Sequence, residues 1–172
     1  MLSDIWQKRL KHWSKEIISM ALMIFILSNA ISFFRSPDIK DKNLPDISTF
    51  LINKELFSTA DYKDEAVLIH FWATWCPTCK LEASNIQSLS EDYNVITIAV
   101  KSGSDAQLKS YLKEHELNFK VINDKEGILS KQFSVQAYPT SFIYDKHNRL
   151  SFSEVGYTST WGLRLRIWWA QR

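Results

Sequence analysis

Hydrophobic and polar positions along this 172-residue chain form runs and stripes that predict a series of strands and helices. Two nearly continuous apolar runs, at residues 66–73 and 95–100, are typical of strands that a sheet buries on both faces. Apolar spacing predicts a helix over 79–93, and an apolar stripe predicts another over 105–115, with Asp105 as its N-cap. Shorter patterns predict a strand and two further helices, at residues 119–122, 127–133 and 159–170.

Two pairs of short strands complete this pattern. Residues 49–52 and 55–58 predict a small hairpin around a polar turn, and residues 140–144 and 150–155 predict a second antiparallel hairpin. The alternation of strands and helices, followed by this hairpin and a last helix, indicates the α/β class. We expect a mixed central sheet with helices on both faces.

The first part of the chain has a different character. Residues 17–34 are 18 positions without a charge, which is just long enough to cross a bilayer core of about 30 Å. Basic side chains precede this segment, and such a flank favours the cytoplasmic side of a membrane. The segment is interpreted as a retained transmembrane helix. A signal peptide cleaved near Ser28-Asn29-Ala30 is one alternative, and a buried core helix is another.

Composition divides the chain at the same place. Residues 1–35 hold five bases and two acids, whereas the remaining residues hold 16 bases and 17 acids. We therefore predict a cytoplasmic tail and anchor at 1–35, a polar linker at 36–45 and a folded domain at 46–172. Because no basic stripe runs through the folded part, nucleic-acid binding is not expected.

The chain has two cysteines, Cys76 and Cys79, directly after a predicted buried strand. A sulfur at the start of a helix meets unpaired N–H groups and the positive end of the helix dipole, which lowers a thiol pKa from about 8.5 to about 3.5–7.5. Cys79 lies one turn further on and can close a small disulfide, and Pro77 suits the first helical turn. The pair therefore predicts thiol–disulfide exchange, in which Cys76 attacks and Cys79 resolves the mixed disulfide.

Metal binding, a binding module and peroxide reduction are other roles that a pair of cysteines can have. Structural zinc normally needs four nitrogen or sulfur ligands, and the sequence offers no second C-x-x-C or H-x-x-x-H pattern, so no metal site is expected. Copper handling by the two soft sulfurs stays an alternative, as does a binding module with an idle dithiol. A peroxidase is not expected, because Ala73 stands where such an enzyme needs a threonine.

The segment FWATWCPTCK resembles the active-site segment of the thioredoxin superfamily, and the chain is similar to its TlpA/ResA-like anchored members, including ScsD-like ones. The resemblance implies a thioredoxin fold over about residues 46–170 and no cofactor. It also implies that Pro139 is cis beside the dithiol and that the Tyr138 backbone pairs with a client chain. The surrounding residues would then contact the substrate, namely Trp75, Pro77, Thr78, Tyr138 and Thr140.

Two further residues fall at positions that matter in that group. Glu82 stands where TlpA/ResA-like proteins carry an active-site acid, and the alternative is a solvated glutamate on the helix surface. His70 stands where thioredoxin has a buried acid. With an ordinary pKa near neutral, His70 would exchange the proton of Cys79. The alternative is a hydrogen-bonded core histidine.

The resemblance favours a reductase that exchanges electrons with cysteines of extracytoplasmic proteins. A DsbD-like membrane protein would supply the electrons, and the domain would face the periplasm from a single-pass anchor in a bacterial inner membrane. A periplasmic oxidase or isomerase stays open, because direction depends on potential and partner.

The C-terminal segment 161–169 is rich in tryptophan and arginine. It is expected to be a helix that packs Trp161, Leu165 and Trp168 on the sheet. The alternative is a contact with a membrane surface or a partner through Trp169 and the arginines at 164 and 166.

Overall fold

The computed structural model describes residues 13, 15–20, 22–23, 42–62 and 64–172. The chain divides into two compact units, Met1–Arg35 and Ser36–Arg172. In the first unit, the described residues are helical and exposed. Among the residues that are described, none of the helices combines the length and the hydropathy that a membrane crossing requires. Most of the expected anchor at 17–34, and its alternative cleavage site, lie outside the described residues.

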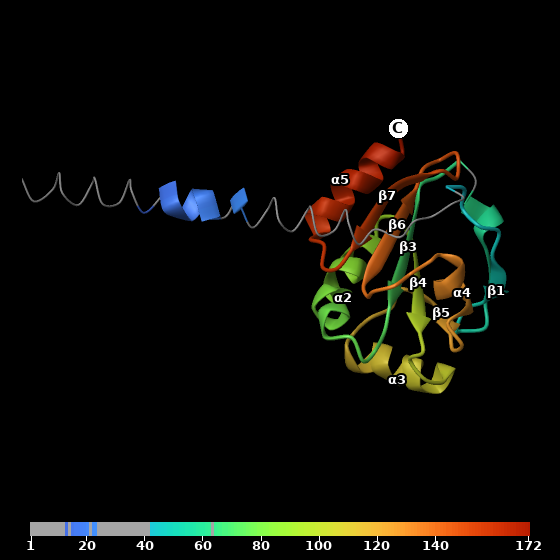
Figure 1. Cartoon of the computed structure of the whole chain (residues 1–172). Coiled ribbons are helices and arrows are strands. Elements are labelled where there is room, and N and C mark those ends of the chain that lie inside the picture. Colours follow the sequence, from blue (N-terminus) through green and yellow to red (C-terminus); the bar gives the residue numbers. More distant parts are fainter. Residues whose placement is uncertain (1–12, 14, 21, 24–41, 63) are drawn as a thin grey trace, which may run out of the picture. The chain divides into compact units, whose positions relative to one another are not determined.

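The second unit is built on a five-stranded sheet in the order β5-β4-β3-β6-β7 (Figure 1). The three strands from β3 to β5 are parallel, whereas β6 and β7 run antiparallel to their neighbours. The strand bounds are Val67–Trp72 for β3, Asn94–Val100 for β4, Lys120–Asp124 for β5, Thr140–Tyr144 for β6 and Leu150–Val155 for β7. The predicted mixed sheet and the predicted hairpin are therefore confirmed.

Helices cover both faces of this sheet. The helices α2 (Pro77–Ser90), α3 (Asp105–Glu114) and α5 (Thr160–Ala170) share one hydrophobic cluster, which includes Ile86, Leu108 and Leu163. Because β3, β4 and β5 step in one direction, right-handed crossovers place α2 and α3 on the same face. The short α4 (Ile128–Gln132) lies against the other face, where Phe133 packs in a second cluster.

A small antiparallel hairpin precedes the sheet in the sequence and packs in the same hydrophobic cluster as α4. It pairs β1 (Ser48–Phe50) with β2 (Leu56–Ser58), and a 3-10 turn, η1 (Thr59–Tyr62), follows. The Ile52 N–H donates to the Val121 carbonyl over 2.9 Å, which joins the hairpin's turn to the edge strand β5. The predicted hairpin is confirmed, with strands one or more residues shorter than expected.

Helix starts differ from the predicted ones for local reasons. The N-cap of α3 is Ser104, whose hydroxyl accepts the Gln107 N–H, while the Gln107 side chain accepts the Ser104 N–H. Asp105, predicted as the cap, is the first helical residue instead. Likewise α2 begins two residues earlier than its apolar spacing indicated, because Pro77 fits the first turn and Cys76 supplies the cap.

The packing predicted for the last helix is wrong. Leu163, Ile167 and Ala170 are the buried residues of α5, whereas Trp161 and Leu165 are exposed. Three small or medium apolar side chains at i, i+4 and i+7 let α5 approach α2 and β6 closely. The tryptophans consequently lie on the outer side of the helix.

Candidate active site

Cys76 and Cys79 form a disulfide at the start of α2, with their Cα atoms 5.3 Å apart. Cys76 is the N-cap of the helix, and its sulfur accepts the Cys79 N–H over 3.2 Å. The two residues are 5% and 3% exposed, so they differ little in burial. In the reduced pair, the same N–H and the helix dipole would stabilise a thiolate at Cys76.

The loop between β3 and α2 is held by hydrogen bonds to the end of β4. The Cys76 N–H donates to the Ala73 carbonyl over 3.2 Å, and the Thr74 N–H donates to the Ser102 hydroxyl over 3.0 Å. Ser102, which is buried, donates in turn to the Val100 carbonyl. Sequence reasoning missed Ser102, because nothing in the local pattern shows that it meets a loop 28 residues earlier.

The loop before β6 lies directly against the dithiol. The Tyr138-Pro139 bond is cis, and the Tyr138 carbonyl oxygen is 3.6 Å from the Cys76 sulfur. The Thr140 hydroxyl donates to the Ala137 carbonyl, and the Gly156 N–H donates to the Pro139 carbonyl. Thr140 is buried, so its side chain supports this loop, and its expected contact with substrate stays a prediction.

Two aromatic residues neighbour the dithiol: Trp75 precedes Cys76 in the chain, and the Tyr138 carbonyl lies near its sulfur. The Trp75 ring meets the Tyr138 ring edge to face, with centroids 5.6 Å apart, and its indole N–H donates to the Lys101 carbonyl. Trp75 and Pro77 are exposed, and Thr78 is half-buried. A polypeptide that approaches Cys76 would therefore meet an apolar rim.

Glu82 is fully buried one helical turn after Cys79, so the interpretation as a solvated surface residue is wrong. Its Oε1 accepts the Thr158 N–H over 3.0 Å, and its Oε2 has no hydrogen-bond partner among the described residues. Burial raises the pKa of Glu82 to about 8, and the Thr158 N–H offsets part of that rise. The carboxyl group is thus mostly protonated at neutral pH.

His70 is buried in β3, where its Nδ1 lies 2.9 Å from the Ser141 hydroxyl of β6. Burial lowers the pKa of His70 to about 3, so the imidazole is neutral at physiological pH. The pKa near neutral that the sequence suggested is therefore wrong. Of the two residues, Glu82 is the one whose pKa suits proton exchange with a thiol near neutral pH.

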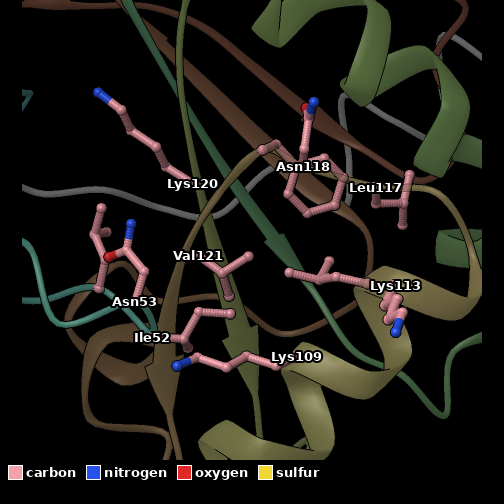
Figure 2. Close-up of a pocket in the computed structure, with 11 residues that line it drawn as sticks. Ile52, Asn53, Lys109, Lys113, Leu117, Asn118, Lys120 and Val121 are labelled. Atoms are coloured by element: carbon pink, nitrogen blue, oxygen red, sulfur yellow. The ribbon is translucent and has the colours of Figure 1, made fainter.

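A separate pocket of about 310 Å³ lies between α3, the start of β5 and the β1–β2 turn (Figure 2). Lys109, Lys113 and Lys120 line it together with apolar side chains, and no residue of the dithiol segment does. Lys120 donates to the Tyr62 hydroxyl. Within the described part of the chain, no group of three or more histidine, cysteine or acidic side chains is arranged to hold a metal ion.

The comparisons with known proteins agree with this geometry. A family profile described as "AhpC/TSA family" matches residues 39–153, which include both cysteines and Pro139. A thioredoxin-like protein of Haemophilus influenzae is 27% identical over 165 residues, covering 95% of this chain and 98% of the relative. The thiol–disulfide oxidoreductase ResA of Bacillus cereus is 28% identical, covering 78% of this chain and 84% of the relative.

Solved structures show the same fold. A thiol:disulfide interchange protein of the thioredoxin family from Chlorobium tepidum superposes with a TM-score of 0.68, at 23% identity, over 78% of this chain and 99% of that chain. StoA from Bacillus subtilis gives a TM-score of 0.63 at 23% identity, over 74% and 98%. The thioredoxin-like fold and the expected enzyme class, a protein thiol–disulfide oxidoreductase, are confirmed. The chain belongs to the AhpC/TSA family, and it is similar to relatives named as the thioredoxin-like protein YneN and the thiol–disulfide oxidoreductase ResA.

Proposed function

We propose that this oxidoreductase works as a reductase: its dithiol donates two electrons to disulfides of extracytoplasmic proteins. The observation that carries this direction is the buried carboxyl group of Glu82, one turn after Cys79. Residues three apart on a helix are neighbours, with Cβ atoms about 5–6 Å apart. The carboxyl group ionises as pH rises toward 8. A carboxylate at that distance opposes a second negative charge on sulfur, and this favours the disulfide over the ionised dithiol.

The exchange proceeds in two balanced steps. The Cys76 thiolate attacks one sulfur of a client disulfide and forms a mixed disulfide, while the other client sulfur leaves as a thiolate and takes a proton. Cys79 then loses its proton and attacks the Cys76 sulfur, which closes the observed disulfide and releases the second client thiol. Two electrons have passed from the dithiol to the client.

Glu82 is proposed to take up the proton that Cys79 loses. Cys79 is buried, so its proton has no direct route to water. A carboxyl group whose pKa is raised to about 8 exchanges protons readily near neutral pH. The Oε2 atom, which lacks a partner among the described residues, is free for this exchange.

Client proteins are proposed to bind across the rim formed by Trp75, Pro77 and Tyr138. The two aromatic rings meet edge to face, and the Tyr138 carbonyl is 3.6 Å from the Cys76 sulfur. By resemblance, the Tyr138 backbone pairs with an extended client segment, and a DsbD-like membrane protein re-reduces the dithiol. The proposed location is the periplasmic side of an inner membrane. The basic residues before the uncharged segment 17–34 support it.

The reduction potential of the Cys76–Cys79 pair tests the proposed direction. In glutathione redox buffers we expect a value near that of thioredoxin, about −270 mV, and not near that of DsbA, about −120 mV. The variant Glu82→Gln should raise the potential at pH 8, where the native carboxyl group is about half ionised. A native potential near that of DsbA would identify an oxidant instead, and stoichiometric Cu(I) binding without disulfide exchange would identify a copper-handling protein.

A further inference from the structure

We propose that the outer side of α5 docks on the surface of a lipid bilayer. This side, called the tryptophan face below, consists of Trp161, Leu165, Trp168 and Trp169. The four side chains recur at i, i+4, i+7 and i+8, and they are 83%, 64%, 43% and 66% exposed. Leu163, Ile167 and Ala170 fill the opposite side of the helix and are buried, so the tryptophan face has no part in the core.

The arginines of α5 do not shield this face. Arg164 forms an ion pair with Asp92 and Arg166 with Glu154, each at 2.6 Å. The Arg172 guanidinium lies over the Trp168 ring, 3.6 Å from its centroid. Arg164 and Arg166 are thus neutralised by partners, and Arg172, which follows α5, is the one of these three arginines that lies on the face. The rest of the face is apolar. Tryptophan on such a face is typical of the headgroup level of a membrane, where one edge of the ring is apolar and the other is wet.

The size of the face favours a bilayer over a second copy of the chain. Three tryptophans of about 250 Å² each, exposed to the fractions given above, present on the order of 500 Å², and Leu165 adds on the order of 100 Å². A two-fold dimer through this face would bury about 1,200 Å² in total, which only reaches the lower end of the 1,200–2,000 Å² or so of stable interfaces. A bilayer needs no complementary shape, and single exposed patches of this size mark interaction sites.

A short tether would keep the domain near such a surface. This step rests on the membrane location proposed above, in which residues 36–45 link the domain to its anchor. Ten residues span at most about 35 Å, so even a weak surface contact is strengthened by the high local concentration of lipid.

Docking of α5 would also orient the dithiol, because hydrogen bonds join the middle of α2 to the start of α5 and to the loop before it. The Asn85 side chain of α2 donates to the Thr158 carbonyl and to the Tyr157 hydroxyl, and it accepts the Thr160 hydroxyl. The two helices therefore move as one unit. With the tryptophan face on the bilayer, the dithiol is held at a fixed height for partners in the membrane.

The test uses the full chain in phosphatidylcholine vesicles at a low protein-to-lipid ratio. In a Cys76→Ser/Cys79→Ser background, a spin label is placed by Gln171→Cys at the end of α5, or by Lys131→Cys in α4 as the matched control. Both positions are exposed, and α4 lies on the other face of the sheet. We expect lipid-dissolved oxygen to reach the label at 171, and a water-soluble nickel chelate to reach the label at 131.

The variant Trp161→Ser/Leu165→Ser/Trp169→Ser should return the label at 171 to water. These side chains are exposed, so stability should change little, and an unfolding curve checks this. A label at 171 that is water-exposed in the otherwise native chain overturns the proposal. Spin–spin broadening without lipid contact also overturns it, in favour of a second copy. Reduction of a soluble disulfide peptide by the cysteine-containing chain judges the proposed reductase function separately.

Discussion

Glu82 couples the stability of the domain to pH through one buried carboxyl group. Its folded pKa is raised to about 8 from an ordinary 4.5. The stabilisation is therefore complete below pH 4.5 and is lost as pH rises to about 8. We expect the Glu82 contribution to the free energy of unfolding of the oxidised protein to fall across this window by on the order of a few kcal/mol. The net fall should appear between pH 6.5 and 8, because His70 acts in the opposite sense below pH 6.5.

The variant Glu82→Gln isolates this effect. Its side-chain oxygen can still accept the Thr158 N–H, but it cannot ionise. Between pH 6.5 and 8, where His70 is neutral in both the folded and the unfolded state, urea unfolding of the variant should therefore lose most of its pH dependence, and the variant should be the more stable protein at pH 8. The exposed Glu126→Gln serves as the control and should keep the native slope. An unchanged slope in Glu82→Gln would show that its carboxylate is solvated in the folded state.

His70 acts in the opposite sense. Its folded pKa is lowered from 6.5 to about 3, so its stabilisation is complete above pH 6.5 and is lost as pH falls toward 3. The variant His70→Asn can keep a hydrogen bond to Ser141 and should lose this acid-side slope, whereas the exposed His147→Asn should keep it. A change in reduction potential under about 10 mV, roughly half a kcal/mol for two electrons, would contradict a tuning role for His70.

Neither of these pKa values could be predicted from the sequence. The segment FWATWCPTCK identifies the dithiol, because the chemistry of the pair depends on four consecutive residues. The environment of Glu82 instead depends on Thr158, 76 positions later, and that of His70 on Ser141, 71 positions later. Such contacts exist only after the sheet has formed.

At the scale of elements, the capping box of α3 supports the loop that positions the dithiol. The N-cap of this helix, Ser104, lies two residues after Ser102, which holds Thr74, and Asn123 of β5 donates to the Gly103 carbonyl between them. Removing the cap acceptor by Ser104→Ala should destabilise the domain by about 1 kcal/mol. The mid-helix variant Ser110→Ala should be neutral or slightly stabilising, because alanine is the better helix former.

Chemical denaturation at pH 7 measures both variants. Equal stabilities for Ser104→Ala and Ser110→Ala would contradict the assigned cap. The sequence analysis predicted Asp105 as the cap, and serine and aspartate are nearly equivalent as N-caps. Only the backbone of residue 104, which is extended at φ −80° and ψ 162°, decides between them.

The last helix shows where pattern analysis reaches its limit. Apolar residues fall on both sides of α5. Leucine, isoleucine and alanine occupy one side, and the tryptophans occupy the opposite side. Periodicity alone cannot choose between two apolar sides. The fit to α2 and β6 makes the choice, since it favours the smaller side chains. Strands β3 and β4 were easier to predict, because a central parallel strand is buried on both faces.

At the scale of the whole molecule, the location of the domain decides which proteins its dithiol can meet. The chain has only two cysteines, so thiol labelling reports on the dithiol alone. The variant Cys79→Ser leaves Cys76 as a free thiol at the start of α2, with the Cys79-position N–H still available to its sulfur. We expect a membrane-impermeant maleimide to modify this variant in intact spheroplasts, and the double variant Cys76→Ser/Cys79→Ser to stay unlabelled.

The basic residues before the uncharged segment are the physical cause of this expected orientation. Neutralising Lys8, Arg9, Lys11 and Lys15 together should lower the fraction labelled from outside, because positive charge on a flank favours the cytoplasmic side of a membrane. Carbonate extraction of the same membranes measures retention of the segment, since a spanning helix stays with the lipid and a cleaved signal peptide releases the domain. Labelling that requires permeabilised membranes would place the dithiol in the cytoplasm, where glutathione keeps thiols reduced, and would remove extracytoplasmic proteins as its clients.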